Sequence, residues 1–221
     1  MRSGVEHIFR GELFGEVDLE RMSAKVKHQP FVNVVQGLFY FSRAYNEQNV
    51  DVSIELFKRA IACYELCLQS DPTNALSLIN CAESYHKMAT FQQSCGKNMS
   101  TVVLDSANDY AQAADVYYLR ALQVNQYSEE YHYLYARFLE RCSKWTQAEK
   151  YHLLGLEINP LSVGNLVGYS QMLRQRGELA WANRFENRME EVHRISKQQT
   201  VIHPSTTKKA PNMRKSSTGI F

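Results

Sequence analysis

The chain has 221 residues, of which 44% are hydrophobic and 22% are charged, a composition typical of a soluble globular protein. Only 10 glycines and 5 prolines occur, which is few for a fold with many tight β-turns and favours helices. The net charge is +2, and the tail from Ser196 onward holds five basic residues and no acid. The rest of the chain therefore has 20 basic against 23 acidic residues, and we do not expect it to bind nucleic acid.

No stretch approaches the roughly 20 apolar residues that span a bilayer, and charges interrupt the first 22 residues where a signal peptide would lie. The five cysteines are an odd number, which is typical of reduced thiols inside the cell. The sequence predicts a cytoplasmic protein that has no membrane partner.

Residues 1–30 are predicted to form a capping segment, most of it helical. Terminal repeats of a helical array need such a cover for solubility. The apolar residues that would cover the first repeat are Ile8, Phe9, Leu13, Phe14, Val17 and Leu19.

Two prolines mark the joints of a repeat further along the chain. Pro72 lies in "LQSDPTNA" and Pro160 in "LEINPLSV", and each is preceded by a stripe of apolar residues at helical spacing. Proline ends the helix before it, and the polar residues after it (Thr73, Asn74 and Ser162) can cap the next helix. Gln126 takes the place of a third proline, 34 residues before Pro160.

The same alternation of apolar stripes and polar joints predicts four helix pairs over residues 31–195. Their expected bounds are 31–72, 75–126 with an insertion over 90–106, 129–160, and 163–192. Small residues recur in the second helix of each pair, where two helices would otherwise clash: Ala60, Ala114, Ala148 and Ala182.

The first helix of each pair repeats one pattern: a large residue, a large or medium one three positions later, a small one beside it, then another large one. The third pair shows it as His132, Tyr135, Ala136 and Leu139, and the first pair as Leu38, Phe41, Ser42 and Tyr45. This pattern resembles the tetratricopeptide repeat (TPR) family over residues 31–192. The resemblance implies an all-α solenoid of antiparallel helix pairs, whose first helices line a concave groove.

Counting outward from the pattern gives the side chains that such a groove would present. A spine of Phe39, Ile79, Tyr133 and Val167 runs beside charges of both signs, which suits a peptide with apolar anchors. The predicted groove residues are Phe39, Arg43, Asn46, Ile79, Asn80, Glu83, His86, Tyr133, Arg137, Glu140, Gln171 and Arg174. The alternative is that some of these residues pack against the array's own terminal helix and contact no partner.

One subfamily of TPR proteins binds the acidic C-terminal tails of chaperones through a clamp of lysine, asparagine and arginine. Only Asn80 matches that clamp, since Phe39 and Arg43 replace two of its residues, and Glu130 and Leu134 two more. A glutamate would repel a carboxylate, so the sequence argues against a chaperone tail as the partner.

The sequence shows no pattern of catalytic, metal-binding or cofactor-binding residues. Cys63 and Cys67 lie one helical turn apart, but no second pair completes a zinc site, and both fall on a buried stripe. Cys95 is a candidate nucleophile without an assignable base, which leaves a cysteine-dependent enzyme as a remote alternative.

We therefore predict a non-catalytic adaptor that binds a protein or peptide partner in the groove, without cofactor or metal. The alternative is a structural subunit that self-assembles, or docks into a larger complex, through its convex face and its insertion. Residues 196–221 are predicted to be a disordered basic tail, in which "TTKKAPNMRKSS" would serve as a nuclear-import or phosphorylation motif, or simply as a solvated tail.

Overall fold

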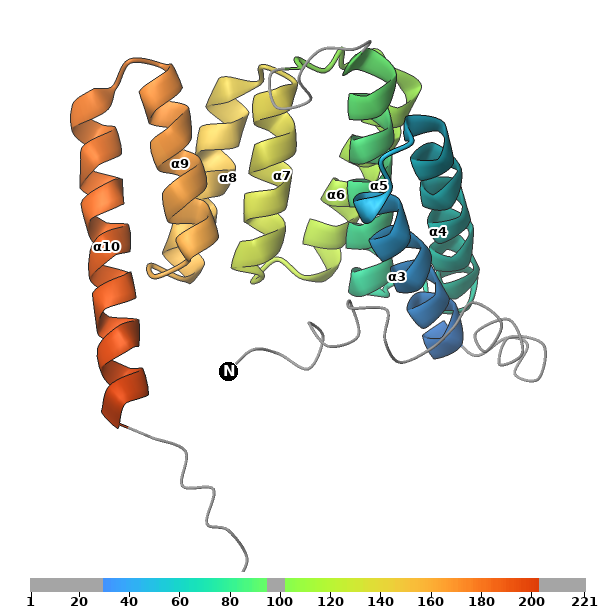
Figure 1. Ribbon diagram of the computed structural model, residues 1–221, viewed down its shortest axis with the longest axis horizontal. Coiled ribbons are helices and arrows are strands. Elements are labelled where there is room, and N and C mark those ends of the chain that lie inside the picture. The colour runs from blue at the N-terminus through green and yellow to red at the C-terminus, as the bar shows by residue number, and fades with distance from the viewer. Residues whose placement is uncertain (1–29, 95–101, 203–221) are drawn as a thin grey trace, which may run out of the picture.

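The structure is a computed structural model that describes residues 30–94 and 102–202, and every regular element within these ranges is a helix. The helices stand side by side as four antiparallel hairpins (Figure 1). In chain order they are α3 (Pro30–Asn46), α4 (Val50–Ser70), α5 (Ala75–Ser94), α6 (Asp109–Val124), α7 (Glu129–Arg141), α8 (Trp145–Ile158), α9 (Val163–Gln175) and α10 (Leu179–Ile202). The expected cap over residues 1–29 and the tail beyond Ile202 lie outside the described residues.

The hairpins form a curved array with two layers. Each helix packs on its neighbours in the chain, and the first helices α3, α5, α7 and α9 also contact one another in series. Among the described helices, no comparable contacts join α4, α6, α8 and α10 to each other. Because the first helices contact one another while the second helices lie apart, the array curves toward the first helices. The first helices therefore line its inner face. The predicted all-α solenoid is confirmed.

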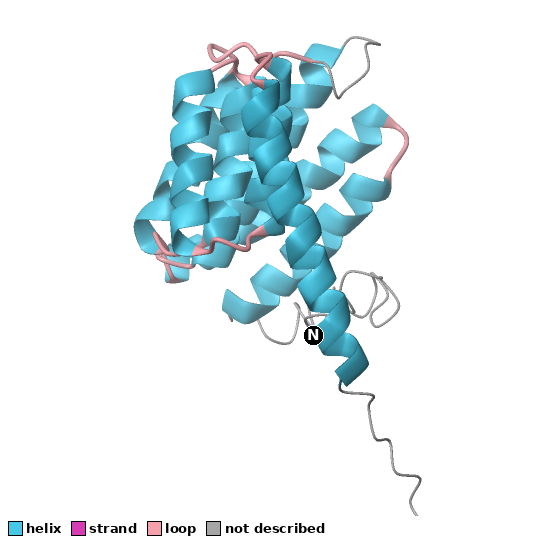
Figure 2. Ribbon diagram, turned by 90° about the vertical axis from the view of Figure 1, so that its left-hand side faces the viewer, coloured by secondary structure: helices cyan, strands magenta, loops and turns pink. Residues whose placement is uncertain are grey.

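Two turns repeat with the same backbone geometry. Ser143, between α7 and α8, and Gly177, between α9 and α10, have positive φ angles of 56° and 81°. In each turn this residue's N–H donates to the carbonyl three positions back, and the next N–H donates to the carbonyl five positions back. The turns gather with the other loops at the two ends of the helices (Figure 2). The two turns lie 34 residues apart, which is the repeat interval that the sequence pattern indicated.

The core is built where small residues let the two helices of a pair approach. Ala60, Ala114, Ala148 and Ala182 are all fully buried, which confirms their predicted role. In the first hairpin Gly37 on α3 has this function as well, because a Cβ atom there would lie 2.3 Å from the ring of Tyr64.

Polar residues begin several helices, and of the predicted caps Thr73, Asn74 and Ser162 only Asn74 makes a capping hydrogen bond. Asn49 accepts from Asp51 and Val52 at 3.0 and 3.2 Å, and Asn74 accepts from the N–H of Ser77 at 3.0 Å. Ser162 precedes α9, but its side chain makes no capping hydrogen bond. Its hydroxyl accepts instead from Asn165 at 3.1 Å.

The first two hairpins differ from the prediction in two details. Tyr45 was predicted to be a core residue, but it is 62% exposed, whereas Leu38 of the same pattern is buried, together with Val34 and Ala44. The pattern is wrong only at its last position, because Tyr45 lies in the final turn of α3, which ends at Asn46. Helix α5 continues to Ser94, so residues 90–94 of the expected insertion are helical.

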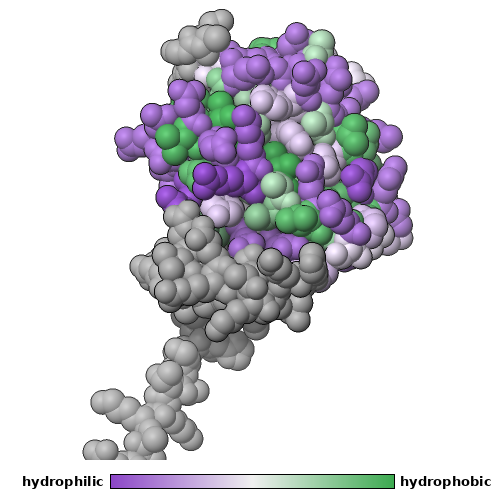
Figure 3. All heavy atoms as spheres, turned by 90° about the vertical axis from the view of Figure 1, so that its right-hand side faces the viewer, coloured by the Kyte–Doolittle hydropathy of each residue, from purple (hydrophilic) through white to green (hydrophobic). Residues whose placement is uncertain are grey.

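The array ends on a polar face. Leu68, Leu122 and Leu156 are buried near the ends of α4, α6 and α8. Glu190 follows Leu156 at the repeat interval and is exposed on α10. The other end, formed by α3 and α4, shows apolar groups scattered among polar ones (Figure 3), and Val52 and Leu66 are the most exposed apolar side chains of α4. Helix α10 continues to Ile202, so the tail expected from residue 196 begins as helix.

Candidate partner-binding groove and adjoining cleft

The predicted groove residues all lie on the inner helices, but they differ in exposure. Arg43, Asn46, Gln171 and Arg174 are exposed, and Phe39, Asn80, Tyr133 and Arg137 are partly exposed. Ile79 is only 5% exposed and belongs to the hydrophobic core. It cannot contact a partner, so the prediction is wrong for this residue. Its side chain turns inward because α5 packs against both α4 and α6.

Three predicted groove residues make contacts within their own hairpins instead. His86, Glu140 and Arg174 occupy one position of the first helices α5, α7 and α9, and each meets a side chain of the second helix. His86 Nδ1 lies 3.2 Å from the Tyr118 hydroxyl, and Glu140 Oε1 lies 2.6 Å from His152 Nε2. Arg174 contacts both oxygens of Glu186, at 2.6 and 2.8 Å. This repeated polar pair holds each hairpin together.

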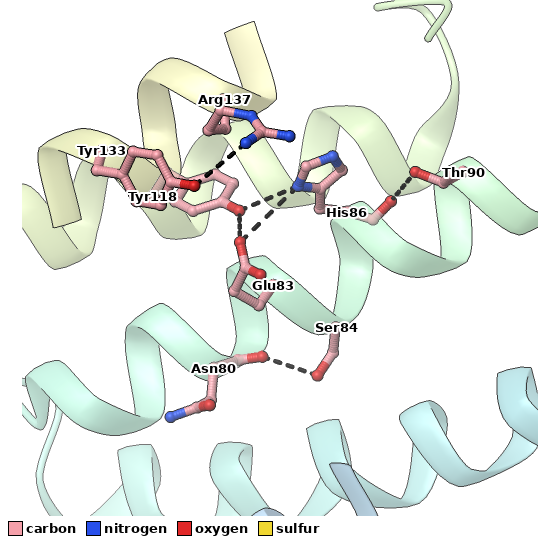
Figure 4. Close-up of polar contacts among 8 residues, drawn as sticks. All are labelled: Asn80, Glu83, Ser84, His86, Thr90, Tyr118, Tyr133 and Arg137. Carbon is pink, nitrogen blue, oxygen red and sulfur yellow. Dashed lines mark hydrogen bonds and ion pairs between the residues drawn. The ribbon is translucent and has the colours of Figure 1, made fainter. Parts of the chain in front are cut away.

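The pair in the second hairpin is part of a larger network (Figure 4). The Tyr118 hydroxyl donates to the Glu83 carboxylate, so its oxygen accepts from His86 Nδ1. Burial alone would raise the pKa of Glu83, but the nearby His86, the hydrogen bond from Tyr118 and the charge of Lys87 outweigh burial and lower it. Burial lowers the pKa of His86, against the opposing effect of Glu83. At neutral pH the network therefore holds a charged glutamate and a neutral histidine.

His152 connects the third and fourth hairpins. It is fully buried, and its Nδ1 lies 3.3 Å from the side-chain oxygen of Asn165. The Asn165 amide group donates to the Glu129 carbonyl at 2.9 Å, which points its oxygen toward the ring. A Cβ atom at Gly168 would lie 2.6 Å from the ring of His152. Glycine is therefore required where the ring approaches α9.

Tyr133 and Arg137 remain on the groove face of α7. Arg137 donates to the Tyr133 hydroxyl at 3.1 Å (Figure 4), and its Nε lies 3.8 Å from a Glu140 oxygen. The Tyr133 ring lies close to α9: a Cβ atom at Gly164 would be 3.3 Å from the ring. These contacts fix an aromatic ring and a guanidinium group side by side, as a preformed surface.

Two amides expected to face a partner are turned to their own helices. Asn46 donates to the Ser42 carbonyl at 2.8 Å, and Asn80 donates to the Leu76 carbonyl at 2.7 Å. Asn80 was the one match to the chaperone-tail clamp.

A cleft of about 440 Å³ opens beside the groove, at the carboxyl ends of α5 and α7. Its lining includes two predicted groove residues, His86 and Arg137. The other lining residues are Tyr45, Glu47, Phe57, Lys87, Thr90, Phe91 and Arg141. The prediction missed these residues. The sequence did hold one signal for the cleft. Lys87 and Arg141 directly follow His86 and Glu140, so a basic residue recurs at the same repeat position in the second and third hairpins.

The returning part of the insertion fastens one wall of this cleft. Leu104 is 2% exposed, and its N–H donates to the Arg141 carbonyl at 2.7 Å. The N–H of Asp105 donates to Gln93 at 2.8 Å, which joins the same segment to α5. The insertion thus ties the end of α7 to the end of α5.

The described cysteines give no sign of a reactive thiol. Cys63, Cys67, Cys81 and Cys142 are free, and burial raises the pKa of Cys63 to about 11. Burial also raises the pKa of Cys142 to about 11. Residues 30–94 and 102–202 contain no group of three His, Cys, Asp or Glu residues arranged to hold a metal ion. Cys95 lies outside the described residues.

The fold matches solved structures of MamA. One, described as "MamA MSR-1 C2", aligns with a TM-score of 0.52 at 14% identity, over 81% of this chain and 86% of that chain. Another, "Crystal structure of MamA", aligns with a TM-score of 0.55 at 14% identity, over 88% and 94%. This likeness concerns the fold alone, and it identifies the chain as a TPR-like helical solenoid. No protein-family model and no curated protein matches the sequence.

Within residues 30–94 and 102–202, no helix combines the length and the apolar character that crossing a bilayer needs.

Proposed function

We propose that the chain is a non-catalytic scaffold that binds a segment of a protein partner along the inner face of its TPR-like solenoid. The observation that carries the proposal is the continuous inner layer of α3, α5, α7 and α9, which presents partly exposed aromatic and charged side chains. Tyr133 and Arg137 lie at its centre. The groove is preformed, so the partner bears most of the ordering entropy on binding.

A pair of matched variants tests this proposal. Tyr133→Ala combined with Arg137→Glu removes the central ring and reverses the charge beside it. The control combines Thr146→Ala with Lys150→Glu on α8, where both residues are exposed. We expect wild type and control to capture the same partner, and the groove variant to lose at least nine-tenths of it at an unchanged melting temperature. Equal capture by all three would contradict the proposal.

The second candidate is self-assembly, or docking into a larger complex, through the outer face. It is favoured by apolar residues on three of the second helices: Leu66, Val116, Leu119 and Leu153 are 49%, 55%, 39% and 45% exposed. Light scattering over a dilution series separates the two candidates. A mass above that of the monomer that falls on dilution, and that is reduced by Val116→Glu, would favour assembly.

The same proposal covers the compartment and the absence of catalysis. Free, partly or fully buried thiols suit a reducing compartment, so we assign the scaffold to the cytoplasm, with the nucleus as an alternative through the basic tail. The partner is a protein other than a chaperone tail, since the clamp positions do not match. The likeness to MamA supports a scaffold rather than an enzyme.

A further inference from the structure

The cleft beside the groove gathers positive charge. Lys87 on α5 and Arg137 and Arg141 on α7 line it, against one lining acid, Glu47. Two further carboxylates lie near these cations, and each has its shortest contact elsewhere, although the second oxygen of Glu140 also lies 3.8 Å from Arg137 Nε. Glu83 accepts from Tyr118, and Glu140 contacts His152 at 2.6 Å. The imidazole in the lining, His86, is neutral because burial lowers its pKa.

This arrangement of cations is unfavourable in the free chain. Arg137 and Arg141 are four residues apart on one helix, a spacing at which like charges repel each other. Burial, and then the charge of Arg137, lower the pKa of Arg141. Like charges held together at a cost in stability are typical of sites that bind the opposite charge.

The walls that complete the cleft are aromatic. Phe57 is fully buried, Phe91 is partly exposed, and Tyr45 is 62% exposed. The Lys87 ammonium lies 5.0 Å from the Tyr45 ring centroid, and no acid among the described residues lies within ion-pair distance of it. A volume of about 440 Å³ is within the range of ligand pockets. One ligand group can therefore meet cations and an aromatic surface together.

We propose that this cleft is a binding site for an internal acidic segment of the partner. A side-chain carboxylate or phosphate would lie between Lys87, Arg137 and Arg141, with a neighbouring apolar side chain on Tyr45 and Phe91. The proposal rests on the proposed function, because it specifies what the groove binds. It concerns another place than the chaperone-tail clamp, since Glu130 precedes Arg141 by 11 residues, about 16 Å along α7.

The insertion is part of this site. It holds the Arg141 backbone through Leu104, and the extension of α5 that precedes it supplies Thr90 and Phe91. Figure 4 shows the lining residues Arg137 on α7 and His86 and Thr90 on α5. The longer second hairpin therefore provides a wall that a 34-residue repeat would lack.

Titration with blocked peptides tests the proposal. The probe is the peptide acetyl-GEEFEEG-amide, whose blocked ends leave only side-chain carboxylates. Matched peptides carry glutamine or phosphoserine in place of glutamate. We expect amide NMR signals of Lys87, Thr90 and Arg141 in the full chain to shift saturably with the glutamate or the phosphoserine peptide. Whichever of these binds more tightly identifies the natural group. The glutamine peptide should bind at least tenfold more weakly.

Two substitutions decide the outcome. Lys87→Gln should weaken binding of the acidic peptide at least fivefold, and Arg137→Gln should do the same. Lys150→Gln on the outer face should not change it. If Arg137→Gln reduces the helical circular-dichroism signal, Lys87→Gln alone decides. Binding that is unchanged in Lys87→Gln, equal for the glutamine peptide, or undetectable at 1 mM overturns the cleft assignment. The groove proposal would stand if Tyr133→Ala with Arg137→Glu still abolished partner capture.

Discussion

The first and last halves of the array use the same hairpin in different ways. In α7–α10 the hairpins follow each other at 34 residues, with identical turns at Ser143 and Gly177. In α3–α6 the first helices are longer, 17 and 20 residues against 13 for α7 and α9. The extra length does not extend the groove evenly. It builds one wall of a cleft, so the irregular half adds a site to the surface that the regular half continues.

Within the last half, the two repeated polar pairs differ in how much water reaches them. His152 and Glu140 form a pair inside the array, whereas Arg174 and Glu186 form the corresponding pair at its end, where side-chain exposures are 49% and 33%. Water screens the outer pair, and the inner pair is part of the packed core. The same position thus serves packing in one repeat and solubility in the next.

The largest predicted effect comes from breaking the inner pair. His152→Ala removes a fully buried ring and leaves the Glu140 carboxylate and the Asn165 oxygen without their partner. We expect a loss of about 3–5 kcal/mol of unfolding free energy, as for other broken buried pairs, measured by urea denaturation. Arg174→Ala is the matched change at the end of the array and should cost far less. Similar losses of unfolding free energy in both variants would contradict the claim that burial makes the inner pair more important for stability than the outer pair.

A smaller effect is expected where the insertion packs. Leu104→Ala removes a side chain that is 2% exposed and should lower the unfolding free energy by about 2–3 kcal/mol. Its neighbour Val103 is 64% exposed, so Val103→Ala is the control and should stay within about 0.5 kcal/mol. Hydrogen exchange at the end of α7 should also rise in Leu104→Ala alone. If exchange there were unchanged, the insertion would not hold α7.

The buried network of the second hairpin predicts a dependence on pH. The pKa values of His86 and Glu83 are both lowered in the folded chain. The unfolded chain therefore binds protons first, and stability falls as the pH drops below about 6.5 for His86, then below about 4.3 for Glu83. Between pH 7 and 5.5, His86→Asn should show a flatter stability profile than wild type in thermal denaturation. A steeper profile in the variant would contradict this assignment.

The smallest effect concerns the repeated turn. Ser143 holds a left-handed conformation at φ 56°, where Gly177 stands in the next hairpin. Ser143→Gly relieves the Cβ strain of the folded chain but raises the conformational entropy of the unfolded chain. We therefore expect the free energy of unfolding to rise by only about 0.5 kcal/mol. Ser143→Ala keeps the strain and should not gain stability. A loss in the glycine variant would mean that the two turns are not equivalent.

The regular half could be predicted from the sequence because its pattern is local. Ala148, Ala182 and the 34-residue interval fix the packing of the hairpins before any contact is known. In α3 the same pattern is right for Leu38 and wrong for Tyr45, which fits the spacing of a core residue but is 62% exposed. Periodicity alone does not decide how far along an apolar stripe the neighbouring helix covers it.

The cleft could not be predicted because its residues meet only in the folded chain. Lys87 and Arg141 come from different hairpins, and the wall residue Phe91 was assigned to the insertion. The pairing of His86 with Tyr118 depends on the contact between α5 and α6, which spacing along one helix does not give. Ile79 was placed in the groove by counting, but the packing of α5 between two neighbours decides its burial.

Site-specific photocrosslinking in cells tests the central claim, that the partner lies on the inner face. A photoreactive residue replaces Gln171 on α9 in one variant and Val116 on α6 in the other, both at exposed positions. The account predicts a crosslinked partner at position 171 and none at position 116. A partner, or a second copy of the chain, crosslinked only at position 116 would contradict it.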